Sequence, residues 1–395
     1  MVMGGGAQRW KPAETGLNRA TVLELFFDLA FVLVLTQLSH YLVTHLSWRG
    51  MFETTVLTAA LWWIWTVVTW ITDVYHDTNP GLQVLVTVLT FGVIAMAVAI
   101  SGAFEGQAFM FAGAYVGVHL VRSSALLVAE RGKATKRPPL RILLWTLASA
   151  PLWFVGAALH GWWQVALWAA AVLIDYESAA AGSPVPQLGR SIHERWQVGD
   201  EHLAERYRQI LLIGMGDAFL TMGMAWDASP TTLLRGAALA LAFVYTALLL
   251  QSYFRVAGQR LAESIARSGN KARVARLAVD CHLLMLLGIV VSSAGIDLKI
   301  RYPLQQPNGF WVAVIIVGPV LFMLGRILFG LLVLGRPSPA RVIALIGLLA
   351  LTPAAGVLPP VLTGLAVAAI LAFVLLPRIS KRFARLIREP VLEEE

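Results

Sequence analysis

Residues 23–41, LELFFDLAFVLVLTQLSHY, constrain the fold of this chain more than any other stretch of its sequence. At about 1.5 Å per residue, a helix of this length nearly matches the roughly 30 Å hydrocarbon core of a bilayer. The stretch nevertheless carries two carboxylates, Glu24 and Asp28, one helical turn apart on the same face. A charge within a membrane span is costly and normally faces a protein interior or water. We therefore predict a membrane-spanning helix whose acids either line a polar interior or hold the helix end at the interface.

The composition of the whole chain excludes an ordinary soluble domain. Of its 395 residues, 58% are hydrophobic and 14% are charged, whereas soluble domains are near 25% charged. The formal net charge of +8 does not indicate nucleic acid as a partner, because the basic residues cluster in short segments between apolar stretches. The single cysteine, Cys281, excludes an intramolecular disulfide. We expect an integral membrane protein whose main partner is the lipid bilayer.

Windows long and apolar enough to cross a bilayer recur along the chain. Twelve of them lie at residues 22–45, 52–74, 81–101, 107–128, 140–159, 161–177, 207–227, 232–254, 274–296, 310–334, 340–356 and 359–377. The fifth and sixth are the least clearly divided, because only His160 and Gly161 separate them. The pattern predicts an all-α, polytopic integral membrane protein with about twelve transmembrane helices in two six-helix halves.

The basic residues predict the orientation of these helices, since cytoplasmic loops of membrane proteins are enriched in lysine and arginine. With a cytoplasmic N-terminus, the basic groups at 131–141, 255–276, 336–341 and 378–388 all fall on the cytoplasmic side. The predicted outer loops keep only Arg49, Lys299 and Arg301, with Arg235 near an outer helix end. We therefore expect a protein of the bacterial cytoplasmic (inner) membrane with both termini in the cytoplasm.

A polar stretch at residues 178–206, with glycines and prolines in its first part, predicts a linker between the two halves. The expected organisation is a cytoplasmic N-terminal segment (1–20), a first six-helix half (21–177), a cytoplasmic linker (178–206), a second six-helix half (207–378) and a cytoplasmic tail (379–395). The linker segment HERWQVGDEHLAER is rich in His, Asp and Glu, but their spacing matches no known metal-ligand motif. We interpret it as a solvated surface helix and predict neither a metal nor a cofactor.

The two halves share a pattern of charge that suggests an internal repeat. The first window of each half carries an aspartate, Asp28 or Asp217, and the fourth carries an arginine, Arg122 or Arg326. Six helices is an even number, so the halves would be related by an axis along the membrane normal. A chance alignment of apolar sequence is the alternative.

Polar side chains in the first half fall on single helix faces at spacings of three and four residues. They are Trp62, Thr66, Thr69 and Asp73 in the second window and Tyr115, His119 and Arg122 in the fourth. In a structural interpretation, Asp28 pairs with Arg122 and Asp217 with Arg326, and the pairs fix the register of the helices. In a functional one, the side chains line a cytoplasm-facing cavity where Asp28 or His119 changes protonation.

In the second half, Asp217 is the strongest candidate for a functional group. It lies about ten residues into its window, near mid-depth at about 1.5 Å per residue. Gly214 and Gly216 would let a helix or a ligand approach it closely, and Thr221 shares its face. His282 enters the ninth window near the cytoplasmic side. Carboxylates at such a depth mark ion or proton pathways.

Three segments resemble a known family. ELFFDLAFVLVL in the first window, HLAERYRQILLIGMGDAFL from His202 and DCHLLMLLGIVVSSAG from Asp280 are similar to segments of the bacterial low temperature requirement protein A family, in the same order. The family usually carries Gly-Glu where this chain has Gly216 and Asp217, so a carboxylate is kept on a shorter arm. The resemblance implies a polytopic membrane protein linked by name to growth in the cold, and it implies no particular reaction.

The leading functional hypothesis is a secondary transporter or ion-conducting protein for an unknown small solute or ion, with protons as a candidate. Its polar interior would contain Glu24, Asp28, Asp73, Tyr115, His119, Arg122, Asp217, Thr221, His282 and Arg326. The sequence has no GxxxxGK[ST], GxSxG or HExxH motif, which argues against ATP-driven work and against these hydrolases. A loose similarity to potassium channels with six-helix repeats is a variant of this hypothesis, since Phe26, Phe27 and Asp28 match their Arg-xxx-Phe-Ser-Asp motif only in part.

Two other classes stay open. An intramembrane enzyme acting on a lipid or a lipid-linked precursor could use Glu24, Asp28, His76 and Asp77 as acid–base groups or as ligands of a divalent metal. A non-catalytic membrane scaffold could support growth under cold stress. Loss of solute flux after Asp28→Asn and Asp217→Asn would separate transport from a scaffold.

Overall fold

The computed structural model describes residues 21–75, 79–130, 137–190, 200–228, 230–254, 257–269 and 271–373. These residues fold into α-helices joined by short turns, and no β-strand occurs among them. The all-α prediction is therefore confirmed for the described part of the chain.

The helices follow the apolar windows closely. They are α1 (Val22–Thr44), α2 (Trp48–Val74), α3 (Pro80–Ala99), α4 (Ala108–Ala129), α5 (Arg137–Ala158), α6 (Trp162–Ala180), α7 (Asp200–Asp227), α8 (Leu233–Phe254), α9 (Ala257–Arg267), α10 (Lys271–Arg301), α11 (Gly309–Leu334), α12 (Pro339–Ala355) and a last helix at Pro360–Phe373. A 3-10 turn, η1 (Ile100–Gly102), follows α3. Each window contains one helix, and the short α9 lies between two windows.

Nine helices of the described chain are long and apolar enough to cross a membrane. They are α1 to α5, α7, α8, α10 and α11, the third of them extended by η1. The protein is therefore a multi-pass membrane protein by the length and composition of its helices. The helices α6, α12 and Pro360–Phe373 fall outside this group, so the count of about twelve spans stays a prediction.

Short polar caps at their ends explain where several helices begin and end. Thr21 and Glu24 form a capping box at the start of α1, in which each side chain bonds the backbone N–H of the other residue. Asn308 caps α11, and Gly335 ends it with a φ of 69°, a conformation that glycine adopts without strain. Such caps satisfy N–H and C=O groups that the helix itself leaves without partners.

The contacts divide the chain into two compact units that do not coincide with the predicted halves. Unit 1 contains residues 1–213 and 261–279, and unit 2 contains residues 214–260 and 280–395. The boundaries fall within α7 and within α10 rather than in the stretch 178–206. The two six-helix halves stay a prediction about membrane topology.

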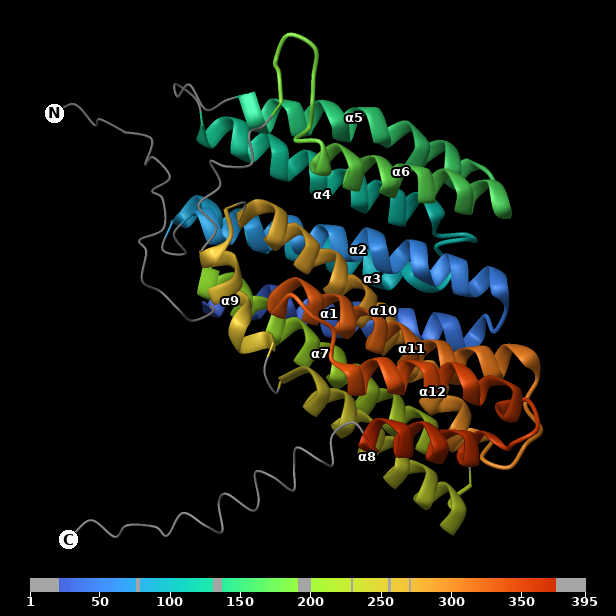
Figure 1. The fold of residues 1–395 in the computed structure, drawn as a ribbon. Coiled ribbons are helices and arrows are strands. Elements are labelled where there is room, and N and C mark those ends of the chain that lie inside the picture. The colour runs from blue at the N-terminus through green and yellow to red at the C-terminus, as the bar shows by residue number, and fades with distance from the viewer. Residues whose placement is uncertain are drawn as a thin grey trace, which may run out of the picture. The chain divides into compact units, whose positions relative to one another are not determined.

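In unit 1 the first six helices pack so that their contacts close on themselves. Helix α1 contacts α2 and α3, α3 contacts α4, α4 contacts α5, α5 contacts α6, and α6 returns to α2. Figure 1 shows α4, α5 and α6 beside the layer that contains α2 and α3. Helix α2 is the most enclosed, since 83% of its membrane-length window is buried. Its side chains Trp62 and Trp65 are fully buried and stack at 4.7 Å.

In unit 2 the close approach of α10 and α11 depends on glycine. A Cβ atom added to Gly288 would lie 2.6 Å from the backbone nitrogen of Phe322, and one added to Gly318 would lie 2.7 Å from that of Ser292. Gly325 is equally close to the carbonyl oxygen of Cys281, at 2.7 Å. Glycine lets helices approach in this way without a side chain between them.

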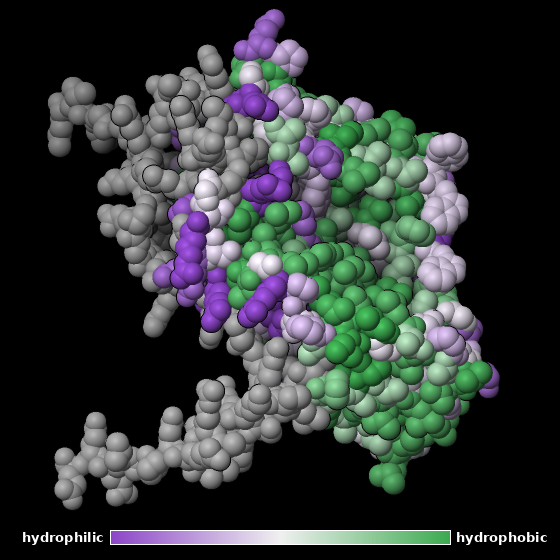
Figure 2. Space-filling view, in the orientation of Figure 1, coloured by the Kyte–Doolittle hydropathy of each residue, from purple (hydrophilic) through white to green (hydrophobic). Residues whose placement is uncertain are grey.

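Many helices also expose large apolar side chains. Leu29, Val84, Phe91 and Phe243 are each more than half exposed. Figure 2 shows apolar side chains covering much of the described surface on the face drawn. Such a surface is unusual for a protein in water and is expected where helices face lipid.

Candidate functional site

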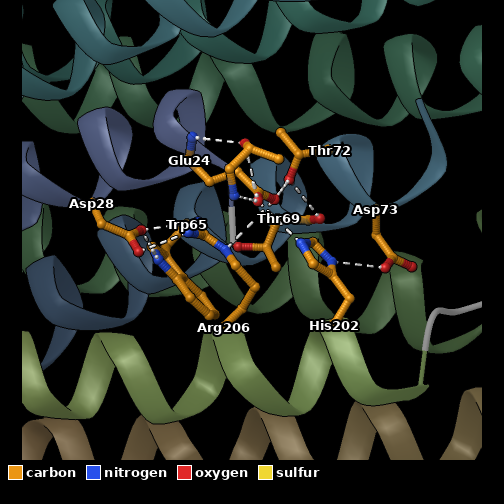
Figure 3. A network of polar contacts seen from close by, with 9 residues as sticks. Glu24, Asp28, Trp65, Thr69, Thr72, Asp73, His202 and Arg206 are labelled. Atoms are coloured by element: carbon orange, nitrogen blue, oxygen red, sulfur yellow. Dashed lines mark hydrogen bonds and ion pairs between the residues drawn. The ribbon is translucent and has the colours of Figure 1, made fainter. Parts of the chain in front are cut away.

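Three helices of unit 1 bring ionisable side chains together at one end of the unit. The chain direction explains the meeting, because α1 and α7 begin at this end and α2 finishes there. We call the group the acid–arginine cluster, and Figure 3 shows it from close by. It consists of Glu24 and Asp28 from α1, Trp65, Thr72 and Asp73 from α2, and His202 and Arg206 from α7.

The centre of the cluster is a bidentate ion pair between Arg206 and Asp28. Nη1 of Arg206 donates to Oδ2 of Asp28 at 2.7 Å, and Nη2 donates to Oδ1 at 2.9 Å. The indole nitrogen of Trp65 donates to the same Oδ1 at 3.0 Å, and the guanidinium lies 5.7 Å from the Trp65 ring centroid. Both charged side chains are buried, at 0% and 1% exposure. The parallel bonds hold α1, α2 and α7 in one register.

Glu24 links this pair to the start of α1. One carboxylate oxygen accepts from the hydroxyl of Thr72 and lies 3.8 Å from Nε of Arg206. The other accepts from the backbone N–H of Thr21 in the capping box and lies 3.0 Å from Nε2 of His202. Glu24 therefore caps a helix and joins the ionic cluster with the same side chain.

His202 lies between two carboxylates. Its Nε2 is 3.0 Å from Glu24, and its Nδ1 is 3.0 Å from Asp73. A neutral imidazole has one N–H donor, and an ionised carboxylate only accepts hydrogen bonds. Both contacts are hydrogen bonds only when the imidazole is protonated or one of the acids carries the proton. The three side chains therefore hold one proton more than a neutral histidine with two carboxylates would hold.

The formal charges of the cluster do not cancel. Three carboxylates, Glu24, Asp28 and Asp73, face one arginine and one histidine. The sum is −1 with a protonated His202 and −2 with a neutral one. In a buried environment a surplus of negative charge favours the binding of a proton or another cation.

Exposure decreases along the cluster. The side chain of His202 is 13% exposed and that of Asp73 is 5% exposed, whereas Glu24, Asp28 and Arg206 are at 1% or less. Asp28 is the seventh residue of α1, about 9 Å from the helix start at about 1.5 Å per residue. The cluster therefore runs from a partly accessible histidine to a fully buried ion pair.

Polar atoms without partners continue this direction along α2. The hydroxyls of Thr69 and Thr66 and the indole nitrogen of Trp62 are buried and have no hydrogen-bond partner among the described residues. They belong to the helix face that the sequence predicted, with Asp73 at its end. A buried polar atom without a partner needs an explanation such as an ordered water or an ion.

The structure brings together three of the predicted residues, Glu24, Asp28 and Asp73, but it corrects the predicted partner of Asp28. Both carboxylate oxygens of Asp28 accept hydrogen bonds from Arg206, and Arg122 belongs to another group of side chains. The sequence could not choose between them, because hydropathy places an arginine in a helix but does not say which helices are neighbours.

His202 and Arg206 were the residues that the sequence analysis missed. The interpretation of the linker as a solvated helix is wrong for their part of it, since α7 begins at Asp200 and Arg206 is fully buried. The available signal was the buried face formed by Leu203, Tyr207 and Ile210 in the same turns. Residues 191–199 of the linker lie outside the described part of the chain.

Tyr115, His119 and Arg122 form a second group with residues of α5 and α6. Asp175 of α6 accepts hydrogen bonds from Tyr115, at 2.8 Å, and from Ser149 of α5, at 3.1 Å. The sequence analysis did not single out Asp175. Its charge acts on Arg122, which shares a face of α4 with Tyr115 and His119. The group is taken up again below.

The predicted residues of unit 2 are also buried. His282 lies 2.9 Å from the hydroxyl of Tyr253. Arg326 donates to the carbonyl oxygens of Ser252, at 3.0 Å, and Tyr253, at 3.4 Å, near the end of α8. A cation there is favourable, because the last carbonyls of a helix carry partial negative charge. Asp217 and Thr221 are 0% and 3% exposed, and the pairing of Asp217 with Arg326 stays a prediction.

No group of three or more His, Cys, Asp or Glu side chains that could hold a metal ion was found among the residues that the structure describes. His76 and Asp77, which the lipid-enzyme hypothesis used, lie outside the described residues.

Apolar helices of membrane-spanning length that bury an ionic cluster define the class of the molecule: an all-helical, multi-pass membrane protein. The sequence matches the family model described as bacterial low temperature requirement A protein (LtrA) over residues 19–376. The chain therefore belongs to the LtrA family, as the resemblance of its segments implied.

The other comparisons add a relative but no known activity. An uncharacterized protein of Rhizobium meliloti (strain 1021) is 31% identical over 315 residues, which cover 79% of this chain and 77% of that protein. No solved structure matches the chain.

Proposed function

We propose that this protein is a secondary transporter or ion-conducting protein whose acid–arginine cluster takes up and releases a proton. The observation that carries the proposal is the position of His202, whose two ring nitrogens both face carboxylates. That arrangement holds a proton between groups that can exchange it, which is the requirement for coupling a proton to another movement.

The energetic expense of the cluster supports the proposal. Burying several charges in a helical membrane protein is unfavourable, and ionisable residues in such positions are commonly functional. The surplus of acids over bases favours a cation or a proton rather than an anion at this site. The unpartnered hydroxyls of Thr69 and Thr66 extend the polar route along α2, beyond the buried ion pair.

The orientation predicted from the basic residues gives the proposal a direction. In the inner membrane, with both termini in the cytoplasm, the start of α1 and the end of α2 lie on the cytoplasmic side. The partly exposed His202 would then exchange its proton with the cytoplasm, and Asp28 would be reached only from within the protein.

A pH jump on proteoliposomes tests the proposal before any solute is known. A proton that enters a buried site moves charge within the membrane, so wild-type protein adsorbed on a capacitive electrode gives a transient current. We expect His202→Gln to reduce that current at least tenfold. His40→Gln changes an exposed histidine of α1 and serves as the matched control, with the wild-type current expected.

Equal currents from the His202→Gln variant and the wild type would contradict the proposal. So would the absence of any current from folded wild-type protein at every pH between 5 and 9. Repeating the jump with sodium, potassium or small organic solutes on one side identifies a coupled species by the current that it adds.

A structural role is the competing interpretation, and the bidentate geometry of Arg206 and Asp28 favours it. In that case the cluster only fixes the register of α1, α2 and α7, and the protein supports growth in the cold as a scaffold. An Asp28→Asn variant that folds and supports growth in the cold as the wild type does would favour the scaffold.

A further inference from the structure

Helices α4, α5 and α6 surround a second set of buried polar atoms, and three of these atoms lack hydrogen-bond partners among the described residues. They are Nε of Arg122, Nε2 of His119 and the indole nitrogen of Trp153. The residues are 5%, 3% and 0% exposed. Each desolvated donor without a partner costs about 1–3 kcal/mol, so three in one place need an explanation.

Contacts through Tyr115 bring these residues together. The ring of Tyr115 lies 4.7 Å from that of His119 and 4.2 Å from that of Trp153, measured between centroids. Arg122 follows His119 by three residues on the same face of α4, and its charge acts on that histidine. The three atoms therefore belong to one site rather than to three separate faults in packing.

The chemistry of the atoms identifies the missing partner as an acceptor. A guanidinium Nε and an indole nitrogen can only donate hydrogen bonds, and an imidazole nitrogen can donate or accept. The nearby acid does not supply the acceptor to them, because Asp175 receives Tyr115 on one oxygen and Ser149 on the other. The positive charge of Arg122 favours an acceptor that is itself an anion.

Charge and surroundings narrow the class of anion further. The carboxylate of Asp175 acts on Arg122 and would oppose a ligand with two negative charges. Aromatic rings surround the site, since Phe111 and Trp168 stack at 5.3 Å and Trp168 lies 5.2 Å from Trp153. Such rings accept an apolar group next to a charged one.

We propose that α4, α5 and α6 form a binding site for a small monocarboxylate, with Arg122 and Trp153 as donors to its oxygens and the aromatic rings beside its apolar end. The site lies within unit 1 and shares no residue with the acid–arginine cluster. The proposal does not rest on transport, because binding is measured at equilibrium in detergent.

The first measurement is the unfolding temperature of the full-length protein in detergent, followed by tryptophan fluorescence. Acetate should raise the unfolding temperature in a saturable way at constant ionic strength, because a ligand of the folded state stabilises it. Propionate should act at lower concentration than acetate. Acetamide, which has the same shape without the charge, should give no rise, and inorganic phosphate should act only at higher concentration than acetate.

Two variants test the assigned donors. Trp153→Phe keeps an aromatic ring and removes only the N–H, and Arg122→Gln removes the charge. Each should raise the half-saturating acetate concentration at least tenfold. Trp163→Phe changes a tryptophan that is 73% exposed and should leave the acetate response unchanged. If Arg122→Gln does not fold, Trp153→Phe decides the question.

A wild-type protein whose unfolding temperature responds equally to acetate, acetamide and chloride would overturn the site. An acetate response that survives unchanged in Trp153→Phe would also overturn it. A saturable response to phosphate at lower concentration than to acetate would reject the monocarboxylate class. None of these results bears on the pH-jump current, which depends on His202.

Discussion

Arg206 carries the largest electrostatic responsibility of any single residue in the described chain of unit 1. Its guanidinium is fully buried between Asp28 and Glu24, and its Nε lies 3.8 Å from the second acid. Buried ion pairs are weak evidence for stability as such, but the removal of one partner leaves an uncompensated charge in a medium that solvates it poorly.

The double-mutant cycle of Asp28 and Arg206 should therefore show strong coupling. We expect Arg206→Gln to lower the free energy of unfolding by about 3–5 kcal/mol. Adding Asp28→Asn to that variant should restore part of the loss, because the unpaired carboxylate disappears. The measurement is denaturant unfolding in detergent. Arg267→Gln, in an exposed pair with Glu263, is the control and should change stability by about 1 kcal/mol or less.

Tyr41 has a similar role near the other end of α1. Its hydroxyl donates to Glu53 at 2.6 Å, and Nε of Arg49 donates to the same carboxylate at 2.8 Å. Tyr41→Phe leaves a buried carboxylate with one donor fewer, so we expect a loss of about 1–3 kcal/mol in the same unfolding measurement. Tyr302→Phe, at a residue 43% exposed, should have little effect. Equal effects of the two substitutions would contradict the assigned role.

At the scale of elements, the helices themselves were the predictable part. Membrane-length apolar windows are encoded locally, so α1 to α8, α10 and α11 lie close to their expected bounds. The partners of buried charges were not predictable in this way. Arg206 lies in a stretch that reads as a polar linker, and only the packing of α7 against α1 and α2 reveals that it is buried.

The contact of α10 with α11 gives a prediction that separates close packing from helix propensity. Alanine favours a helix over glycine by about 1 kcal/mol at an interior position. At Gly288, the new methyl group would lie 2.6 Å from a backbone nitrogen of α11, so Gly288→Ala should destabilise the protein by about 1–3 kcal/mol.

Gly295 supplies the matched control for that substitution. It lies on the same helix, but its nearest neighbour would be 3.4 Å from an added Cβ, which is an ordinary contact. Gly295→Ala should therefore be neutral or stabilising. A Gly288→Ala protein that unfolds at the same temperature as Gly295→Ala would show that the backbones can separate at no cost.

At the scale of the whole molecule, the open question is which of the shorter helices cross the membrane. Helix α6 decides much of it, because nine helices have the length and composition of spans and α6 is outside that group. If all twelve predicted windows cross, residue 190 is cytoplasmic and residue 305 is outside. If α6 does not cross, residues 159 and 190 lie on the same side.

Cysteine labelling in intact cells distinguishes these topologies. In a Cys281→Ala background, Gln305→Cys should react with a membrane-impermeant thiol reagent, and Arg190→Cys should react only after the cells are permeabilised. Both native residues are exposed, so neither change disturbs a buried contact. Labelling of Arg190→Cys in intact cells would contradict twelve spans.

The double use of Glu24 has a consequence for how the molecule could sense its own charge state. One carboxylate both fastens the first turn of α1 and receives the imidazole from α7. Neutralising it would unlatch a helix terminus and loosen an ionic bridge in the same event. A single hydrogen ion arriving at that oxygen would thus be converted into slack at the beginning of a transmembrane segment.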